Sequence, residues 1–182
     1  MRMILTFLLM ATTAMADPVM IEDFDEGAAQ RWRYTSDRVM GGVSDGGAGL
    51  GREDDVTFAQ LRGTVSTANN GGFIQIRTAL RQPLPDGSTG ITLRVRGNGE
   101  AYFIHLGPVT ARRPWQYYQA RFETTDAWQD VTLLWTDFAP QGGLSPQFAV
   151  ADIRSIGIVA YGSNYEAALD IDWLRTVTIE RP

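Results

Sequence analysis

The residues with the most specific spacing stand in two glycine-rich segments. SDRVMGGVSDG (residues 36–46) places Asp37 before paired glycines, and NNGGF (residues 69–73) places two asparagines before another pair. Paired glycines adopt backbone conformations closed to other residues, and Asp or Asn side chains hydrogen-bond to backbone amides in turns. Phosphate binding is excluded for the first segment, because it runs into the acids of residues 53–55 and not into a helix N-terminus. We therefore predict that residues 41–51 form a long, mobile loop between two strands.

The composition removes several classes of chemistry. The chain has no lysine and no cysteine, and its one histidine is His105. Walker A loops and Schiff-base enzymes require a lysine, and a zinc site would here depend almost wholly on carboxylates. No G-x-S-x-G segment accompanies His105 to form a catalytic triad, and no acid pair stands out for glycoside hydrolysis. We predict no catalytic residue, no cofactor and no bound metal, with His105 as a sheet-face residue that has a hydrogen-bond partner.

Four arginines on predicted strands are candidates for ligand binding. Arg77, Arg94, Arg96 and Arg121 stand near tyrosine or glutamine. Arginine beside aromatic rings on one sheet face binds sugars or acidic peptides. The alternative is that these arginines neutralise the acids of a solvated face, and the sequence does not choose between the two.

The segment RRPWQYYQAR (residues 112–121) mixes arginine with aromatic residues. Such mixtures are typical of recognition surfaces for proteins or sugar rings. Tyr118 begins an inward-facing alternation with residues 120 and 122, which indicates that part of the segment belongs to the core. Trp115 and Tyr117 are therefore the better candidates for ligand contacts, together with Arg121.

Acidic residues gather near both ends of the chain: Glu22, Asp23, Asp25, Asp170 and Asp172. If the end strands pair, such a cluster of oxygens suits calcium. The interpretation that we favour is that these acids point outward from edge strands, where charge discourages aggregation.

The elements that position these residues are strands, because apolar and polar residues alternate with a period of two and no helical period is sustained. Residues 91–96 and 102–106 are predicted to form a hairpin across Asn98-Gly99. Roughly ten short strands separated by turns indicate an all-β antiparallel sandwich or jelly roll. The further predicted strands cover residues 19–24, 32–35, 56–67, 73–79, 117–124, 131–135, 153–160 and 169–179, and the first and last should pair.

The first residues are typical of a secretory signal peptide. Arg2 precedes an apolar run that ends at Ala14-Met15-Ala16, so cleavage is predicted after Ala16, with export to the periplasm or medium. The run is too short to span a membrane. The remaining 182 − 16 = 166 residues suit a single domain at 17–182, which we do not expect to be an integral membrane protein. Its net charge of 15 − 21 = −6 argues against nucleic acid as a partner.

Read in order, SDRVMGGVSDG, FAQLRGTVSTANNGGFIQIR, GITLRVRGNGEAYFIHL, YYQARFETTDAWQDVTLLWTDFAP and IRSIGIVAYG resemble the complex I intermediate-associated protein family, over nearly the whole chain after residue 16. The resemblance implies a galactose-binding-like jelly roll with a non-enzymatic role in assembling NADH:ubiquinone oxidoreductase. It also implies that the two glycine-rich loops shape one binding surface. The residues of that predicted surface are Asp37, Met40, Gly41, Gly42, Ser44, Asn70, Gly71, Gly72, Phe73, Arg77, Arg96 and Tyr102.

Two features depart from the family pattern. Asn98 stands where the family has an acid between two glycines, and the predicted signal peptide would place the chain outside the compartment in which mitochondrial members work. We therefore expect an exported, non-enzymatic domain that engages a partner protein in the assembly or maturation of an envelope or respiratory complex. The alternative is a carbohydrate-binding module that uses the arginine and aromatic residues.

Overall fold

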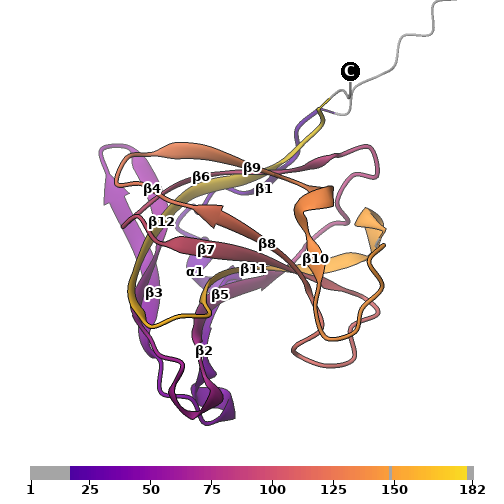
Figure 1. Cartoon of the computed structure of the whole chain (residues 1–182). Helices are drawn as coiled ribbons and strands as arrows, with labels where there is room; N and C mark the ends of the chain where they lie inside the picture. Colours follow the sequence, from indigo (N-terminus) through magenta and orange to yellow (C-terminus); the bar gives the residue numbers. More distant parts are fainter. Residues whose placement is uncertain (1–16, 148, 180–182) are drawn as a thin grey trace, which may run out of the picture.

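The computed structural model describes residues 17–147 and 149–179, so the predicted signal peptide and its cleavage point lie outside the described residues. Two six-stranded antiparallel sheets pack face to face (Figure 1). The all-β sandwich predicted from the sequence is thereby confirmed. The first sheet has the order β3-β4-β12-β6-β9, with β1 added along β12, and the second has the order β10-β8-β7-β11-β5-β2.

The strands of the first sheet are β1 (Met20–Glu22), β3 (Asp45–Glu53), β4 (Val56–Val65), β6 (Gly90–Gly97), β9 (Gln129–Leu134) and β12 (Tyr165–Val177). Those of the second are β2 (Arg33–Ser36), β5 (Phe73–Ala79), β7 (Ala101–Pro108), β8 (Tyr118–Glu123), β10 (Ala139–Pro140) and β11 (Ile153–Tyr161). The helical elements are α1 (Ala28–Arg31) and the 3-10 turns η1 (Asp37–Met40), η2 (Ala68–Asn70), η3 (Trp135–Asp137) and η4 (Val150–Asp152). None of the described helices is long and apolar enough to cross a membrane.

The core lies between the sheets and follows the period-two alternation of the sequence. Ile91, Leu93 and Val95 of β6 face Ile104 and Leu106 of β7 across the sandwich, all fully buried. The alternate residues of each strand point outward. Two outer faces result, one on each sheet, and side chains for binding must come from these faces or from the loops.

The glycine-rich residues 41–51 were expected to be a loop, and that expectation is wrong for residues 45–51. Residues Asp45–Glu53 form the edge strand β3, which pairs with β4 in unbroken register from Asp45 opposite Thr64 to Glu53 opposite Val56. Glycine carries no side chain to alternate, so the sequence pattern hides this strand. Gly46 and Gly63 stand opposite each other, and a Cβ on either would overlap the backbone of the other strand.

The predicted hairpin across Asn98-Gly99 is also wrong, although both of its strands exist. β6 pairs with β9 and β12, whereas β7 pairs with β8 and β11, so the turn crosses from one sheet to the other. Tyr102 Oη donates a hydrogen bond to Asn98 Oδ1 at 2.8 Å, and Asn98 Nδ2 donates to the Glu166 carbonyl at 2.6 Å. These bonds tie the turn to β12. Two consecutive strands show the same alternation of apolar and polar residues whether they pair with each other in a hairpin or lie in different sheets. The sequence pattern therefore could not distinguish the two arrangements.

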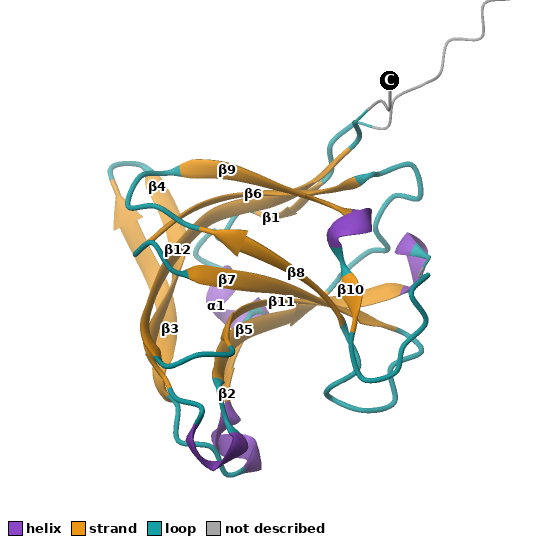
Figure 2. Ribbon diagram, viewed as in Figure 1, coloured by secondary structure: helices purple, strands orange, loops and turns teal. Residues whose placement is uncertain are grey.

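The two ends of the described chain lie together, as the sequence predicted. β1 pairs antiparallel with β12, with Met20 opposite Arg175 and Glu22 opposite Leu174. In Figure 1 the indigo N-terminal strand runs beside the yellow C-terminal one. η1 and η2 sit next to each other at the far end of β2, at the bottom of the view in Figure 2. These two turns carry the two glycine-rich motifs.

Candidate functional site

The two glycine-rich motifs close around one buried carboxylate, Asp37, which is fully inaccessible to solvent. Its Oδ1 accepts a hydrogen bond from the Ser44 amide at 2.9 Å, and its Oδ2 accepts from Ser44 Oγ at 2.5 Å. The Gly72 and Phe73 amides also donate to Oδ2, at 2.5 and 3.3 Å. We call this arrangement the Asp37 latch: Asp37, Gly42, Ser44, Gly71, Gly72 and Phe73.

The glycines of the latch are required by space and by backbone conformation. A Cβ on Gly42 or on Gly71 would overlap the Asp37 carboxylate. Gly41 and Gly72 have positive φ angles of 92° and 129°, which other residues rarely adopt. The order of charge, glycine pair and serine in the first motif is therefore explained by the carboxylate that it encloses.

Electrostatics favour an ionised carboxylate in the latch. Burial raises the pKa of Asp37, but the hydrogen bonds from Ser44, Gly72 and Phe73 outweigh it and hold the pKa below its usual value. No described arginine pairs with Asp37, so backbone amides and one hydroxyl carry the stabilisation. The latch joins two loops and presents no charge to a ligand. The turns around the latch are exposed, and Val39 and Met40 are 76% and 64% exposed.

The other residues of the predicted surface lie elsewhere. Tyr102 is fully buried in the core, and its hydroxyl accepts a hydrogen bond from the Ala168 amide at 2.8 Å. Arg96 lies on the outer side of the first sheet and pairs with Asp170 and Glu53 at 2.8 and 2.7 Å. Arg77 lies on the outer face of the second sheet, and Asn70 has a positive φ of 58° in η2. The structure thus brings the motif loops together without Arg77, Arg96 or Tyr102.

The acids near the chain ends do not form one group, and the expectation that they point outward from edge strands is wrong for Glu22 and Asp170, which are buried. Glu22 accepts hydrogen bonds from Arg31 and from Trp32 Nε1, and Asp25 accepts a hydrogen bond from the same Arg31 nitrogen at 2.6 Å. Ligand oxygens of Glu22, Asp23 and Asp25 lie within 4.8 Å of one another, but the Arg31 guanidinium already neutralises two of the three acids. The C-terminal acids pair elsewhere: Asp170 with Arg62 and Arg96, and Asp172 with Arg94.

The outer face of the second sheet gathers the remaining polar and aromatic candidates. The inward-facing alternation predicted for β8 is found, since Tyr118, Ala120 and Phe122 are buried. The alternate residues therefore point outward. This outer face carries Phe73, Gln75 and Arg77 of β5, Phe103 and His105 of β7, Gln119 and Arg121 of β8, Tyr161 of β11, Arg33 of β2 and the adjoining Tyr117.

Aromatic rings pack on one another on this face. His105 and Tyr117 stack with centroids 3.8 Å apart and an interplanar angle of 12°. The Tyr161 ring meets His105 and Phe103 edge-on, at 6.1 and 5.7 Å. Tyr117 and Trp115 were predicted from the sequence, whereas Phe103 and Tyr161 were missed, although both continue the outward alternation of their strands. That alternation is the signal that would have found them.

His105 is a neutral imidazole within this ring cluster. Burial and the nearby charge of Arg77 lower its pKa to about 3, against a side-chain hydrogen bond with Gln119 that raises it. The Nε2 atom of His105 is buried and has no hydrogen-bond partner among the described residues. The sheet-face placement and one polar partner match the sequence prediction, but one ring nitrogen is left unsatisfied.

The four arginines considered from the sequence divide into two kinds. Arg94, Arg96 and Arg121 each pair with a carboxylate, which matches the charge-neutralising alternative. Arg77 forms no ion pair with a described acid, and its Nη2 donates to Ser155 Oγ at 2.6 Å. Desolvation lowers the pKa of Arg77. Arg77 is therefore the arginine of this set whose charge is left without an opposite charge.

Beside the ring cluster lies a polar hollow of about 350 Å³. Its lining includes Phe103 and Tyr161, the ion pair of Arg121 and Glu123, and Glu100. Trp115 belongs to the loop between β7 and β8, is 53% exposed and has the Arg113 guanidinium 5.4 Å above its ring. Aromatic and charged groups in such a hollow suit a polar ligand with apolar patches.

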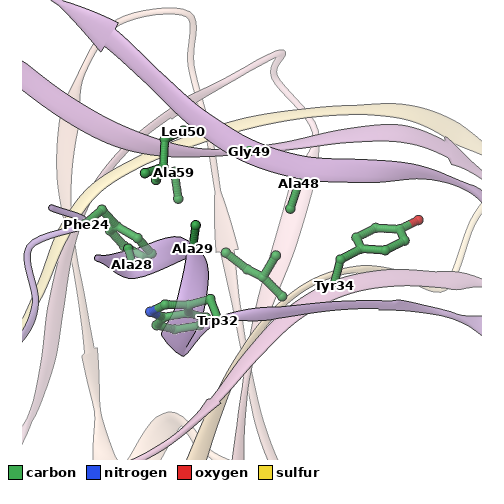
Figure 3. Close-up of a pocket in the computed structure, with 10 residues that line it drawn as sticks. Phe24, Ala28, Ala29, Trp32, Tyr34, Ala48, Gly49, Leu50 and Ala59 are labelled. Atoms are coloured by element: carbon green, nitrogen blue, oxygen red, sulfur yellow. The ribbon is translucent and has the colours of Figure 1, made fainter. Parts of the chain in front are cut away.

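A second cavity, of about 110 Å³, opens between β2, β3 and α1 (Figure 3). Ala28 and Ala29 of α1 approach Leu50 and Ala59 of the strands above, and the Tyr34 hydroxyl points away from the other labelled side chains. The lining is mostly apolar and carries no charged group. This cavity offers no convergent polar groups, so the outer face of the second sheet is the candidate site.

Comparison with known proteins agrees with this architecture. The sequence matches the family described as complex I intermediate-associated protein 30 over residues 22–171, so the chain belongs to that family. No curated protein matches it significantly. Among solved structures it is similar to a family 11 carbohydrate-binding module from Clostridium thermocellum in complex with a β-1,3-1,4-mixed-linked tetrasaccharide, with a TM-score of 0.73, 14% identity and coverage of 91% of this chain and 98% of that chain.

A family 30 carbohydrate-binding module is also similar, with a TM-score of 0.63, 12% identity and coverage of 91% of this chain and 90% of that chain. An agarase, AgWH50C, matches with a TM-score of 0.58 and 9% identity, over 91% of this chain and 25% of that chain. These low identities establish the fold alone. The β-sandwich of carbohydrate-binding modules is thus the fold of this family member.

Proposed function

We propose that the chain is an exported, non-enzymatic domain that binds a partner protein through the outer face of the second sheet. The partner belongs to an envelope or respiratory complex whose assembly or maturation the domain assists. Membership of a family described by its association with complex I intermediates supports a protein partner. The observation that carries the proposal is Arg77, a cation without an opposite charge, beside the half-buried rings of His105 and Tyr117.

The placement of the titratable groups supports binding over catalysis. His105 is neutral and stacked, and no serine hydroxyl of the described residues hydrogen-bonds to it. The buried carboxylates of Glu22 and Asp170 are paired with arginine, and that of Asp37 is enclosed by amides. General acid–base catalysis needs a group of tuned pKa within reach of a substrate, and these groups do not supply one.

The test is affinity capture of the tagged, full-length protein from detergent-solubilised native envelopes, followed by mass spectrometry. We expect a defined set of envelope or respiratory-complex subunits with the native sequence. Arg77→Ala and Trp115→Ala should each lose that set. Arg52→Ala is the matched control, because Arg52 is an exposed arginine of β3 on the other sheet. Capture of the same subunits by Arg77→Ala would contradict the proposed binding face.

Export is tested separately by cell fractionation and by N-terminal sequencing of the recovered protein. A chain that begins at Asp17 and is found outside the cytoplasm is expected from the sequence of residues 1–16. Recovery of the uncleaved chain from the cytoplasm would contradict this part of the proposal.

Carbohydrate binding is the second candidate, and the polar hollow favours it. Phe103, Tyr161 and the Arg121–Glu123 pair offer the apolar faces and hydrogen-bonding groups that sugars require. Titration with a β-1,3-1,4-mixed-linked oligosaccharide, followed by intrinsic fluorescence and calorimetry, tests it. Binding that is lost in Tyr161→Ala and kept in Arg52→Ala would support this candidate. A flat titration with this and other neutral glucans would remove it.

A further inference from the structure

We infer that a row of residues across the outer face, Arg33, Arg77, Gly157, His105 and Gln119, binds a carboxylate on an acidic segment of the partner protein. The strand register places these five side by side: Arg33 opposite Arg77, Arg77 opposite Gly157, Gly157 opposite His105, and His105 opposite Gln119. We call this set the cationic row. The inference rests on the proposed function, because it names the chemistry of the partner at the same face.

Two arginines stand at one end of the cationic row. Arg33 and Arg77 are cross-strand partners on β2 and β5, and both side chains are exposed. Neither arginine forms an ion pair with an acid of residues 17–147 or 149–179, although the chain has more acids than bases. An anion from outside the chain would supply the opposite charge that both arginines lack.

Glycines make room for the Arg77 guanidinium. A Cβ on Gly107 of β7 would lie 2.6 Å from Arg77 Nη2, and a Cβ on Gly157 would lie 3.8 Å from Arg77 Cγ. The Arg77 side chain therefore crosses β11 and ends over β7. A guanidinium has five N–H donors, and the described contacts of Arg77 use one of them, toward Ser155. The remaining donors suit a carboxylate, which arginine binds with two parallel hydrogen bonds.

His105 is the ring that lies next to Arg77 on this face. It follows Arg77 and Gly157 in the cationic row, and the Arg77 charge is close enough to act on its ring. Its buried Nε2 has no described partner. Because this nitrogen is closed to solvent, a carboxylate bound to Arg77 would act on the His105 ring through its charge and not through a direct hydrogen bond.

The geometry favours an acidic peptide segment over an acidic sugar. Sugar rings stack on free aromatic faces, whereas His105 and Tyr117 cover one face of each other, with ring centroids 3.8 Å apart. Arg33 lies on β2, the last strand of its sheet, and edge strands accept extended segments.

The experiment uses a hexaglutamate peptide as the probe and the His105 ring as the reporter, since it is the single histidine of the chain. The full chain with isotope-labelled histidine is titrated by NMR, with hexaglutamine as the uncharged control peptide. We expect a saturable shift of the His105 ring signals with hexaglutamate alone, weakened by added salt. Arg77→Gln and Arg33→Gln should each weaken binding by about tenfold, and Arg52→Gln should leave it unchanged.

Equal binding of hexaglutamate by the native chain and by Arg77→Gln would overturn the inference, as would equal shifts with hexaglutamine. A hexagalacturonate titration is the third arm: binding of that acidic sugar without binding of hexaglutamate also overturns it, because the carboxylate then comes from a glycan. The two proposals fail separately. If envelope capture depends on Arg77 but hexaglutamate gives no response, the proposed partner-binding face would still be supported. Only the inference that the partner contributes an acidic segment would be contradicted.

Discussion

The Asp37 latch and the cationic row each centre on one charged side chain. The charge is enclosed by hydrogen-bond donors in the latch and lies open to solvent in the row. Asp37 is fully buried and receives four hydrogen bonds from Ser44, Gly72 and Phe73. Arg77 is exposed, donates one hydrogen bond to Ser155 and has another arginine opposite it. A satisfied buried charge joins parts of a fold, whereas an unsatisfied exposed one is available to a ligand. The most distinctive sequence motif therefore marks the architecture, and the candidate site lies elsewhere.

The largest effect is expected from removing the latch carboxylate. Asp37→Ala leaves the buried amides of Ser44, Gly72 and Phe73 without acceptors, which should lower the free energy of unfolding by about 3–5 kcal/mol. Urea denaturation of the purified protein measures this change. Asp37→Asn, which keeps one acceptor oxygen, should lose less. A loss below about 1 kcal/mol for Asp37→Ala would show that the latch does not hold the two loops together.

A smaller loss of stability is expected when a side-chain atom is added inside the latch. Gly42→Ala places a methyl group against the Asp37 carboxylate and should destabilise the fold by about 2 kcal/mol. Gly47→Ala is the matched control, because a Cβ at Gly47 in β3 meets no atom within 4 Å. That control should be neutral or stabilising by less than about 1 kcal/mol. Equal thermal midpoints for the two variants would contradict the steric account of the motif.

Arg96 and Arg77 allow a direct comparison between an arginine whose charge is paired within the fold and one whose charge is free to bind a ligand. Arg96 pairs with Asp170 and Glu53, and its guanidinium lies 5.1 Å from the Phe58 ring and 4.6 Å from the Trp128 ring. Arg96→Ala should therefore cost about 1.5 kcal/mol of stability. Arg77→Ala should stay within about 0.5 kcal/mol of the native protein and lose only ligand capture. A loss of cooperative melting in Arg77→Ala would instead make that arginine structural.

The smallest expected effect is the pH dependence caused by His105. Its folded pKa of about 3 lies below the unfolded value of 6.5, so below pH 6.5 the unfolded chain binds a proton that the folded chain does not. Stability is therefore expected to fall by about 1 kcal/mol between pH 7.5 and 5.5. His105→Gln should remove this slope. An unchanged slope in that variant would assign the pH dependence to other groups.

The Asp37 carboxylate acts in a lower pH range, which separates it from His105. Because its pKa is lowered in the folded protein, its contribution is fully present above the unfolded pKa of about 3.8 and is lost as pH falls through the folded value. Acid denaturation curves of the native chain and of Asp37→Asn should therefore differ below about pH 4 and run parallel above it. Divergence above pH 5 would contradict this assignment.

Strands were predictable because the alternation of side chains is local. The outward and inward residues of β8 follow directly from the order Tyr118, Gln119, Ala120, and the end strands pair as their sequences indicated. Two predictions failed for different reasons: a local pattern does not record which strand lies beside another, and glycine has no side chain with which to show the alternation. β6 and β7 alternate as a hairpin would, yet each pairs within a different sheet, and β3 is too rich in glycine to alternate at all.

The sequence by itself determined the class of this protein: the all-β fold, the family to which it belongs, and the absence of the lysine and cysteine that many enzymes need. Tertiary structure alone decided the roles of its charged residues. Asp37 receives a hydrogen bond from an amide 35 residues away, and Arg77 lies opposite an arginine on another strand. Whether a charge is enclosed or left open depends on groups that only folding brings within hydrogen-bond distance, and short-range sequence patterns carry no record of them.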